Sequence, residues 1–271
     1  MKFFERRTGA APPADRFGTL AVRLGHATPG QVETALNEQR SRAPSPGEQR
    51  RLGMIMVEMG MITSMQLGHI LNRSKTDAFQ ISEDAFRLAT RLEILFEKGQ
   101  VYVFSGASKA PPLLDMVNQL AVAMALFGNG PVLLVDGDLE HPALHDLHQL
   151  PASPGLGDIL LEKAGLDAVV RPTAFAGLSL LAAGETGRCP LPLLLSKHVG
   201  DLFVEMRRKY KLVLVAAAPI LKSSETGVLA PQTDGAVIGA VAGHDSLSSI
   251  ARVAEIFEAL RVPVLGSVLC E

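Results

Sequence analysis

The residues with the most informative chemistry lie between positions 101 and 145, where an apolar run, a loop, a helical segment and a second apolar run follow one another. This order is typical of the start of an α/β nucleotide-binding domain, in which the loop after the first strand binds phosphate. Such a loop reads G-x-x-x-x-G-K-[ST], because glycines let the backbone wrap the phosphates, Lys contacts them and the hydroxyl binds Mg²⁺. Here the loop has Gly106 and Lys109, but Leu113 and Leu114 stand at the Lys and hydroxyl positions. We therefore expect the fold without the usual phosphate chemistry.

Two carboxylates follow the second apolar run. Asp136 and Asp138 come at the end of an expected strand, where a nucleotide-binding protein could use them as ligands. Without Lys or Mg²⁺ beside them, two carboxylates cannot position a triphosphate. The alternative is that they accept hydrogen bonds from the first turn of the next helix.

Composition limits the classes of function. The 271 residues are 47% hydrophobic with a net charge of −2, which allows a proper core and argues against a nucleic-acid-binding surface. No apolar run is long enough to span a bilayer and the N-terminus lacks the apolar centre of a signal peptide, so we expect a cytoplasmic protein. Cys189 and Cys270 have no metal-ligand spacing, and we expect no disulfide. We also expect a solvated helix rather than a metal site around three histidines, namely His141, His145 and His148.

The C-terminal two-thirds alternate between short apolar runs and helical segments. The runs are Val101–Phe104, Val132–Val135, Leu178–Ala182, Leu212–Val215, Ala236–Val241 and Val264–Leu269. Apolar runs between helices indicate a mostly parallel sheet covered on both faces. We predict this α/β domain over residues 99–271, after a linking segment, 76–98, with an amphipathic helix from about Ser82 to Lys98.

Upstream, the sequence repeats itself with an offset of 35 residues. The motif Arg16-Phe17-Gly18 recurs as Arg51-Leu52-Gly53, and Thr28-x-x-Gln31 recurs as Thr63-x-x-Gln66. The Thr-x-x-Gln pairs are typical of capping boxes at helix starts. Each copy is predicted to be a helical hairpin, so residues 16–75 form a small all-α domain after a flexible tail, residues 1–15.

This repeat resembles the N-terminal domain of type II secretion and type IV pilus assembly ATPases, in some of which the paired motifs bind cyclic di-GMP. The resemblance implies that the ligand contacts are Arg16, Gly18, Gln39, Arg51, Leu52 and Gly53. An Arg guanidinium can stack on guanine or bond to it, which makes the chemistry plausible. The repeats depart from the pattern at several Leu positions, and Ser74 replaces a Gln. The alternative is that Gly and Leu only pack the helices of a docking module.

Residues from about 81 onward resemble the cytoplasmic tyrosine-kinase-like P-loop ATPases of bacterial capsule and exopolysaccharide systems, relatives of MinD and ParA. The matching blocks are residues 83–87 (EDAFR), 132–139 (VLLVDGDL), 154–160 (PGLGDIL), 210–215 (YKLVLV) and 264–269 (VLGSVL). The first block is similar to the family's oligomerisation helix. The family's D-[TS]-P-P motif, which carries the Walker B aspartate, becomes AAAP from Ala216, which removes the carboxylate that would organise Mg²⁺. Because the sequence stops directly after the last expected strand, we expect no Tyr-rich tail.

The joint changes at Leu113, Leu114 and Ala216 predict a non-catalytic pseudo-ATPase, and the resemblance implies that it regulates or scaffolds exopolysaccharide synthesis or export. Cyclic di-GMP is then a candidate ligand, and we expect no ATP or Mg²⁺. The resemblance implies self-association, and a membrane-bound polysaccharide co-polymerase or another export or secretion component as the partner that recruits the chain to the inner membrane. One alternative is an active ATPase or tyrosine autokinase with an atypical site on Lys109, Asp136 and Asp138. Another is a docking module for a secretion or pilus machine.

Overall fold

The chain divides into two compact units, residues 1–43 with 51–80 and residues 44–50 with 81–271. The computed structural model describes residues 17–41, 52–63, 66–67, 70, 81–95, 99–108, 111–127, 130–187 and 190–270. Each unit has its own buried apolar residues, for example Ile55 in the first and Leu134 in the second. Within these ranges, no helix combines the length and the apolar character needed to cross a membrane.

The first unit contains α1 (Phe17–Arg23), α2 (Pro29–Ser41) and α3 (Leu52–Glu58). Its backbone repeats as the sequence does. Gly25 and Gly60 end the first helix of each copy in the left-handed region, with φ of +71° and +67°, a conformation that favours glycine. Both capping boxes form, because the amides of Thr28 and Thr63 each donate to a Gln Oε1 three residues on, at 2.8 Å. The described residues of the two copies therefore share the same turn and cap.

The second unit is built on a seven-stranded sheet in the order β3-β4-β2-β5-β1-β6-β7. The strands are β1 (Gln100–Gly106), β2 (Val132–Gly137), β3 (Arg171–Pro172), β4 (Leu178–Leu181), β5 (Leu212–Ala217), β6 (Gly235–Val241) and β7 (Val264–Cys270). All neighbours pair in parallel except β3 and β4. The predicted sheet is confirmed, and the short β3 edge strand is an addition that the sequence did not indicate.

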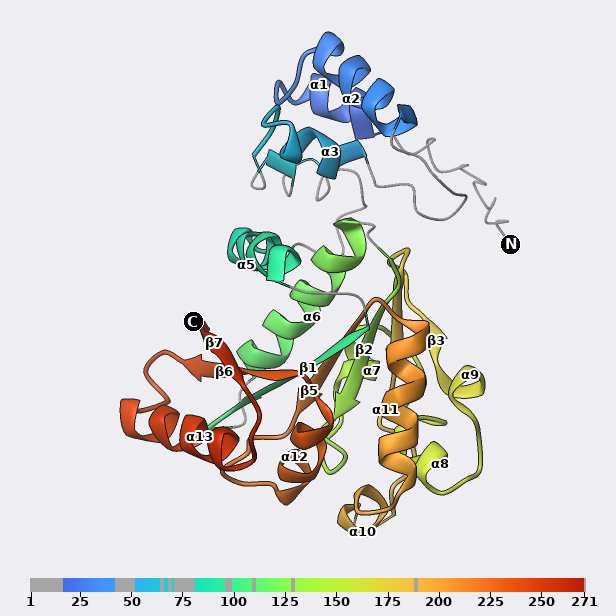
Figure 1. Ribbon diagram of the computed structural model, residues 1–271, viewed down its shortest axis with the longest axis vertical. Helices are drawn as coiled ribbons and strands as arrows, with labels where there is room; N and C mark the ends of the chain where they lie inside the picture. Colours follow the sequence, from blue (N-terminus) through green and yellow to red (C-terminus); the bar gives the residue numbers. More distant parts are fainter. Residues whose placement is uncertain are drawn as a thin grey trace, which may run out of the picture. The chain divides into compact units, whose positions relative to one another are not determined.

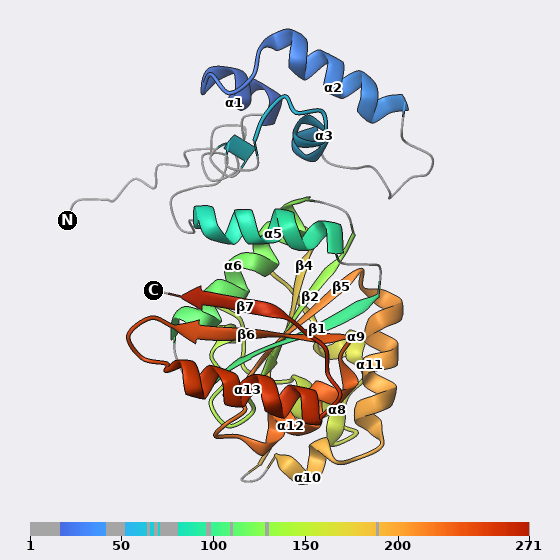
Figure 2. The same cartoon turned by 60° about the vertical axis from the view of Figure 1, so that its left-hand side comes forward.

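Helices cover both faces of this sheet, as Figure 1 and Figure 2 show, with α5 and α6 on one face and α11, α12 and α13 on the other. The helices of this unit are α5 (Glu83–Leu95), α6 (Pro111–Phe127), α7 (Leu144–Leu147), α8 (Leu156–Leu160), α9 (Leu166–Val169), α10 (Leu191–Leu194), α11 (His198–Lys209), α12 (Ser224–Leu229), the 3₁₀ helix η1 (Ala230–Gln232) and α13 (Leu247–Ala259). The predicted helix over 82–98 is α5, and residues 96–98 lie outside the described ranges.

Successive strand residues point to opposite faces, which decides what each helix layer covers. Val103 and Val215 belong to a core cluster with Phe203 of α11 and Phe257 of α13. Their neighbours along the strands, such as Phe104, therefore face the α6 layer. On that side the ring centroids of Phe86 in α5 and Phe127 in α6 lie 6.3 Å apart.

Candidate functional site

The sheet register places three of the sequence positions discussed above in one row. Ala216 of β5 pairs with Phe104 of β1 on one side and with Asp136 of β2 on the other. All three lie near the C-terminal ends of parallel strands, the edge at which α/β proteins of this architecture bind ligands. Ala216, where the motif that this segment resembles has an aspartate, therefore lies directly beside Asp136.

The first turn of α6 places Leu113 and Leu114 around the same cavity as this row of strand residues. A Cβ placed on Gly239 of β6 would lie 2.3 Å from Leu113 Cδ1, so the Leu113 side chain is packed directly onto this glycine. Gly239 pairs in register with Gly106 of β1. In the loop after β1, the Oγ of Ser108 donates a hydrogen bond to a carboxylate oxygen of Asp245 at 2.7 Å. Lys109, the other candidate in this loop, lies outside the described residues.

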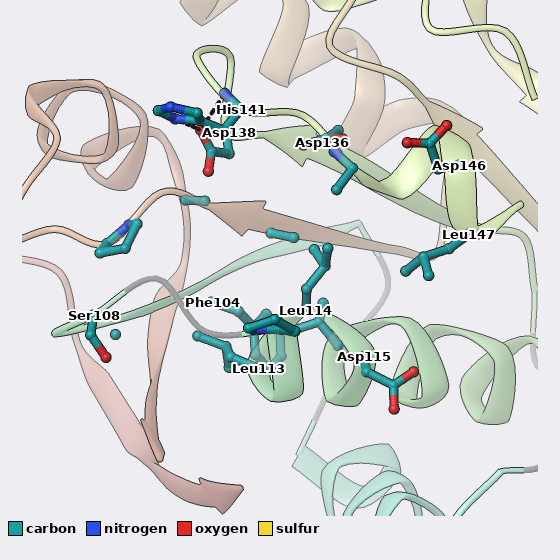
Figure 3. A pocket seen from close by; sticks show the side chains of 17 residues that line it. Phe104, Ser108, Leu113, Leu114, Asp115, Asp136, Asp138, His141, Asp146 and Leu147 are labelled. Atoms are coloured by element: carbon teal, nitrogen blue, oxygen red, sulfur yellow. Dashed lines mark hydrogen bonds and ion pairs between the residues drawn. The ribbon is translucent and has the colours of Figure 1, made fainter. Parts of the chain in front are cut away.

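Together these elements enclose a cavity of about 400 Å³ (Figure 3). Much of its lining is apolar and includes Phe104, Leu113, Leu114, Val117, Leu147 and Ala216. Its ionisable lining residues are Asp115, Asp136, Asp138, Asp146 and His141. No Lys or Arg belongs to the lining in the described part of the chain, so the cavity combines an apolar floor with acidic groups.

Asp136 is the most deeply buried of these acidic residues, at 1% exposure. Its Oδ2 accepts hydrogen bonds from the amides of Ala143 and Leu144 at 3.0 and 2.9 Å, at the start of α7. Its Oδ1 is also buried and has no hydrogen-bond partner among the described residues. Burial raises the pKa of Asp136 to about 6, because the backbone amides of Leu144, Ala143 and Asp138 offset the loss of solvation only in part. The helix-capping alternative therefore accounts for the hydrogen bonds of Oδ2, whereas Oδ1 is an acceptor without a partner among the described residues.

Asp138 and the three histidines lie beside different partners. Asp138 Oδ1 accepts the amide of His141 at 2.9 Å and lies 3.8 Å from its ring Nδ1. His145 instead lies beside a neighbouring carboxylate, and His148 Nε2 lies 2.8 Å from Oδ1 of Asn118. The described ranges contain no group of three His, Cys, Asp or Glu residues able to hold a metal ion. The solvated helix expected here is the four-residue α7, and His148 is half-buried, with its pKa lowered by burial.

Sequence reasoning missed one buried carboxylate near this site. Glu225, in the first turn of α12, is 3% exposed. Its Oε2 accepts the amide of Leu139 at 3.2 Å, while Oε1 has no partner in the described part of the chain. Burial, followed by the nearby charges of Glu140 and Asp138, raises its pKa to about 7. An acidic residue in a first helical turn looks like an ordinary dipole-stabilising residue, so the sequence held no signal for its burial.

In the first unit, the structure assigns a packing role to the glycines of the repeated motif. A Cβ on Gly18 would lie 2.6 Å from Val32 Cγ1 and 3.6 Å from Leu52 Cδ2. A Cβ on Gly53 would lie 2.5 Å from Leu67 Cδ1 and 2.9 Å from Phe17 Cζ. Each glycine thus receives one side chain from its own copy and one from the other copy. Of the remaining predicted contacts, Gln39 lies in α2, and Arg16 and Arg51 lie outside the described residues.

Sequence comparison relates this chain to bacterial tyrosine-protein kinases. It is 28% identical over 138 residues to the tyrosine-protein kinase ptk of Acinetobacter johnsonii, a match that covers 51% of this chain and 19% of the kinase. It is 34% identical over 112 residues to the tyrosine-protein kinase wzc of Salmonella typhimurium, covering 41% of this chain and 14% of that protein. CapB of Staphylococcus aureus is 26% identical over 137 residues, which cover 51% of this chain and 60% of CapB. The chain thus spans less than two-thirds of the length of each, and no family model matches it.

Solved structures give the same relationship at the level of the fold. The kinase domain of the Escherichia coli tyrosine kinase ETK superposes with a TM-score of 0.63 at 18% identity, covering 90% of this chain and 93% of that one. The septum site-determining protein MinD from Pyrococcus horikoshii, solved with Mg-ADP, superposes with a TM-score of 0.55 at 19% identity, covering 63% and 69%. The resemblance suspected for residues from about 81 onward is confirmed: this chain is a relative of the bacterial tyrosine-protein kinases, and its sheet has the MinD-like P-loop ATPase fold.

Proposed function

We propose that the chain is a non-catalytic relative of these kinases that regulates or scaffolds exopolysaccharide synthesis or export. One observation carries this proposal: the side chains that should bind phosphate and Mg²⁺ are replaced by Leu113, Leu114 and Ala216, which line an apolar cavity. A hydrocarbon side chain offers neither a charge to a phosphate nor an oxygen to a metal. The carboxylates left in the lining would also repel a triphosphate in the absence of a cation.

The experiment that tests this proposal measures Mg·ATP binding and turnover by the purified full chain. We expect no ATP-dependent heat in calorimetry and no phosphate release above that of the Lys109→Ala variant. The triple variant Leu113→Lys, Leu114→Thr, Ala216→Asp introduces the three side chains that the motifs call for and serves as the matched comparison. ATP turnover by the wild type that disappears in Lys109→Ala would overturn the proposal.

An active tyrosine autokinase would need a tyrosine hydroxyl that can accept a phosphoryl group, and the chain has two tyrosines. Tyr102 is 4% exposed within β1, and its hydroxyl donates to Gln100 Oε1. Tyr210 is half-buried at the end of α11, and burial raises the pKa of its hydroxyl. Neither environment favours phosphoryl transfer to the hydroxyl. Mg²⁺-dependent phosphotyrosine at either position, detected by mass spectrometry, would support the kinase alternative.

A membrane-bound polysaccharide co-polymerase, or another export component, is the partner that fits this proposal. The comparisons provide the support, since one relative is described as a putative tyrosine-protein kinase in a cps region and one solved structure with a similar fold is the chimerical protein CapA2B2. We propose that the chain docks onto such a partner at the inner membrane and self-associates, without turning over ATP. Co-purification with the co-polymerase of the same cell, unchanged by nucleotide depletion, is the expected result. Loss of co-purification on nucleotide depletion would contradict it.

Cyclic di-GMP binding by the first unit is a second candidate function. The observation in its favour is that the turn and the capping box occur twice in equivalent form, which would suit a ligand with two guanines. Calorimetry with cyclic di-GMP should give heat for the wild type and none for Arg16→Ala combined with Arg51→Ala. Arg40→Ala, an exposed site in the last turn of α2, is the matched control. Equal binding by the wild type and the double variant would leave the docking-module alternative in place.

A further inference from the structure

We propose that the cavity at the ends of β1, β2 and β5 binds a small amphipathic amine, an apolar body that carries a single ammonium group. The inference rests on the proposed function in one respect, because it requires that the cavity is not used for Mg·ATP. It goes beyond that function by giving the cavity a ligand class of its own.

The shape and lining of the cavity select the apolar body. Its volume of about 400 Å³ falls within the range of about 300–1,000 Å³ that is typical of small-molecule sites. Leu113 and Leu114 are only half-buried, so both keep apolar surface that a ligand could cover. Figure 3 shows them on the α6 side of the cavity, with Asp136 and Asp138 on the opposite side. A ligand that spans this gap meets hydrocarbon at one end and carboxylates at the other.

The buried carboxylate of Asp136 selects the ammonium group. Its Oδ1 is an acceptor without a partner among the described residues, in a side chain that is 1% exposed. An unpaired buried acceptor is costly, and a charged donor is the partner that recovers most of that cost. Asp138 also lies in the lining and adds negative potential, although its Oδ1 already accepts the amide of His141. Because no Lys or Arg lines the described part of the cavity, no cation from these residues competes with the ligand.

The same charges discriminate against other ligands of the same size. A carboxylate or phosphate would meet like charge at Asp136 and Asp138, and none of the described lining residues is a compensating Lys or Arg. A neutral alcohol could donate one hydrogen bond to Asp136 but would lack the charge. The expected order of affinity is therefore ammonium, then alcohol, then carboxylate. Asp115 and Asp146 belong to the rim, and in Figure 3 the Asp115 carboxylate points away from the cavity.

The experiment uses the full chain with labelled Leu and Val methyl groups, observed by NMR at pH 7.5. The probes are 2-phenylethylammonium, 2-phenylethanol and 3-phenylpropionate, which share one ring and differ in charge. We expect the ammonium compound to shift the methyl resonances of Leu113, Leu114, Val117 and Leu147, and to bind at least about tenfold more tightly than the carboxylate, a difference of about 1.4 kcal/mol. Equal affinity for the three probes, or shifts confined to other methyl groups, would overturn the inference.

Two variants show whether Asp136 is the source of the discrimination. Asp136→Asn keeps an acceptor for the two amides and should reduce the ammonium affinity by about tenfold, with little change for the alcohol. Asp201→Asn removes the same charge from an exposed position on α11 and should change neither affinity. If Asp136→Asn bound the ammonium compound as tightly as the wild type does, Asp136 would not be the source of the discrimination.

A final titration with Mg·ATP separates the two proposals. Shifts at the same four methyl groups would overturn both the non-catalytic function and the amine site. If neither Mg·ATP nor the ammonium compound shifts these methyl resonances, the amine site alone is overturned. Silence with Mg·ATP and response to ammonium is the result we expect.

Discussion

At the scale of single residues, Asp136 is a buried carboxylate with no Lys or Arg among the described residues that line its cavity. Its pKa is raised from 3.8 to about 6, with burial as the main cause. Between these values the folded protein binds the proton more tightly than the unfolded chain does. The stability that this proton contributes is therefore fully present below about pH 3.8 and is lost as the pH rises through 6.

The first prediction follows from this loss of stability with rising pH. Asp136→Asn removes the titration, so the free energy of unfolding of the wild type minus that of the variant should fall by about 2 kcal/mol between pH 4.5 and 7.5. Denaturant unfolding monitored by tyrosine fluorescence is a suitable measurement, because the chain has no Trp and both Tyr residues lie in the second unit. The lowered pKa of His148 acts in the opposite direction, but it is present in both proteins and cancels in the difference. A difference that does not change with pH would contradict the assigned burial of Asp136.

The second prediction concerns the contact between Leu113 and Gly239. Gly239→Ala should destabilise the second unit by about 1–3 kcal/mol, because the new methyl group overlaps Leu113 Cδ1 and Cδ2. Adding Leu113→Ala should recover much of that loss, so the two changes are expected to be strongly non-additive in a double-mutant cycle. Gly106→Ala is the matched control, since its Cβ would lie 2.6 Å from the Gly239 carbonyl oxygen, a backbone atom that Leu113→Ala cannot remove. Additive effects of Gly239→Ala and Leu113→Ala would refute the contact.

At the scale of elements, the sheet was predictable and the cavity was not. Six strands were predicted as apolar runs, because a parallel sheet covered on both faces needs residues that are apolar at every position. The seventh strand, Arg171–Pro172, has two residues and no such pattern. The losses at Leu113, Leu114 and Ala216 were also visible in the sequence. That these changes gather around one cavity depends on the register of β1, β2 and β5, and no local pattern encodes the pairing of segments so far apart.

The third prediction belongs to the packing of the repeated helices. Gly18→Ala and Gly53→Ala should each destabilise the first unit by about 1–3 kcal/mol, because the methyl group added at Gly18 would overlap Val32 and the one added at Gly53 would overlap Leu67 and Phe17. Gly30→Ala is the matched control in α2: its Cβ would meet nothing within 4 Å, and the change should be neutral or stabilising. Thermal unfolding followed by far-ultraviolet circular dichroism measures all three. If Gly18→Ala proved as stable as Gly30→Ala, the close packing of Gly18 against Val32 would be refuted.

At the scale of the whole molecule, two compact units with separate buried cores predict two unfolding transitions. Ile55→Ala, at a residue with 1% exposure in the first unit, should lower a transition seen by circular dichroism but not by tyrosine fluorescence. Leu134→Ala, at a residue with 0% exposure in β2, should lower the transition that tyrosine fluorescence reports. Each change should cost about 2–5 kcal/mol in its own unit, through the cavity that it leaves.

The same two transitions assign each proposed ligand to its unit. A ligand that binds only the folded state raises the midpoint of the unit that binds it, by an amount that grows with ligand concentration. Cyclic di-GMP should therefore raise the transition lowered by Ile55→Ala, and 2-phenylethylammonium the one lowered by Leu134→Ala, with Mg·ATP raising neither. A rise of the tyrosine-reported midpoint with Mg·ATP would instead mean that the second unit has kept a nucleotide site despite Leu113, Leu114 and Ala216.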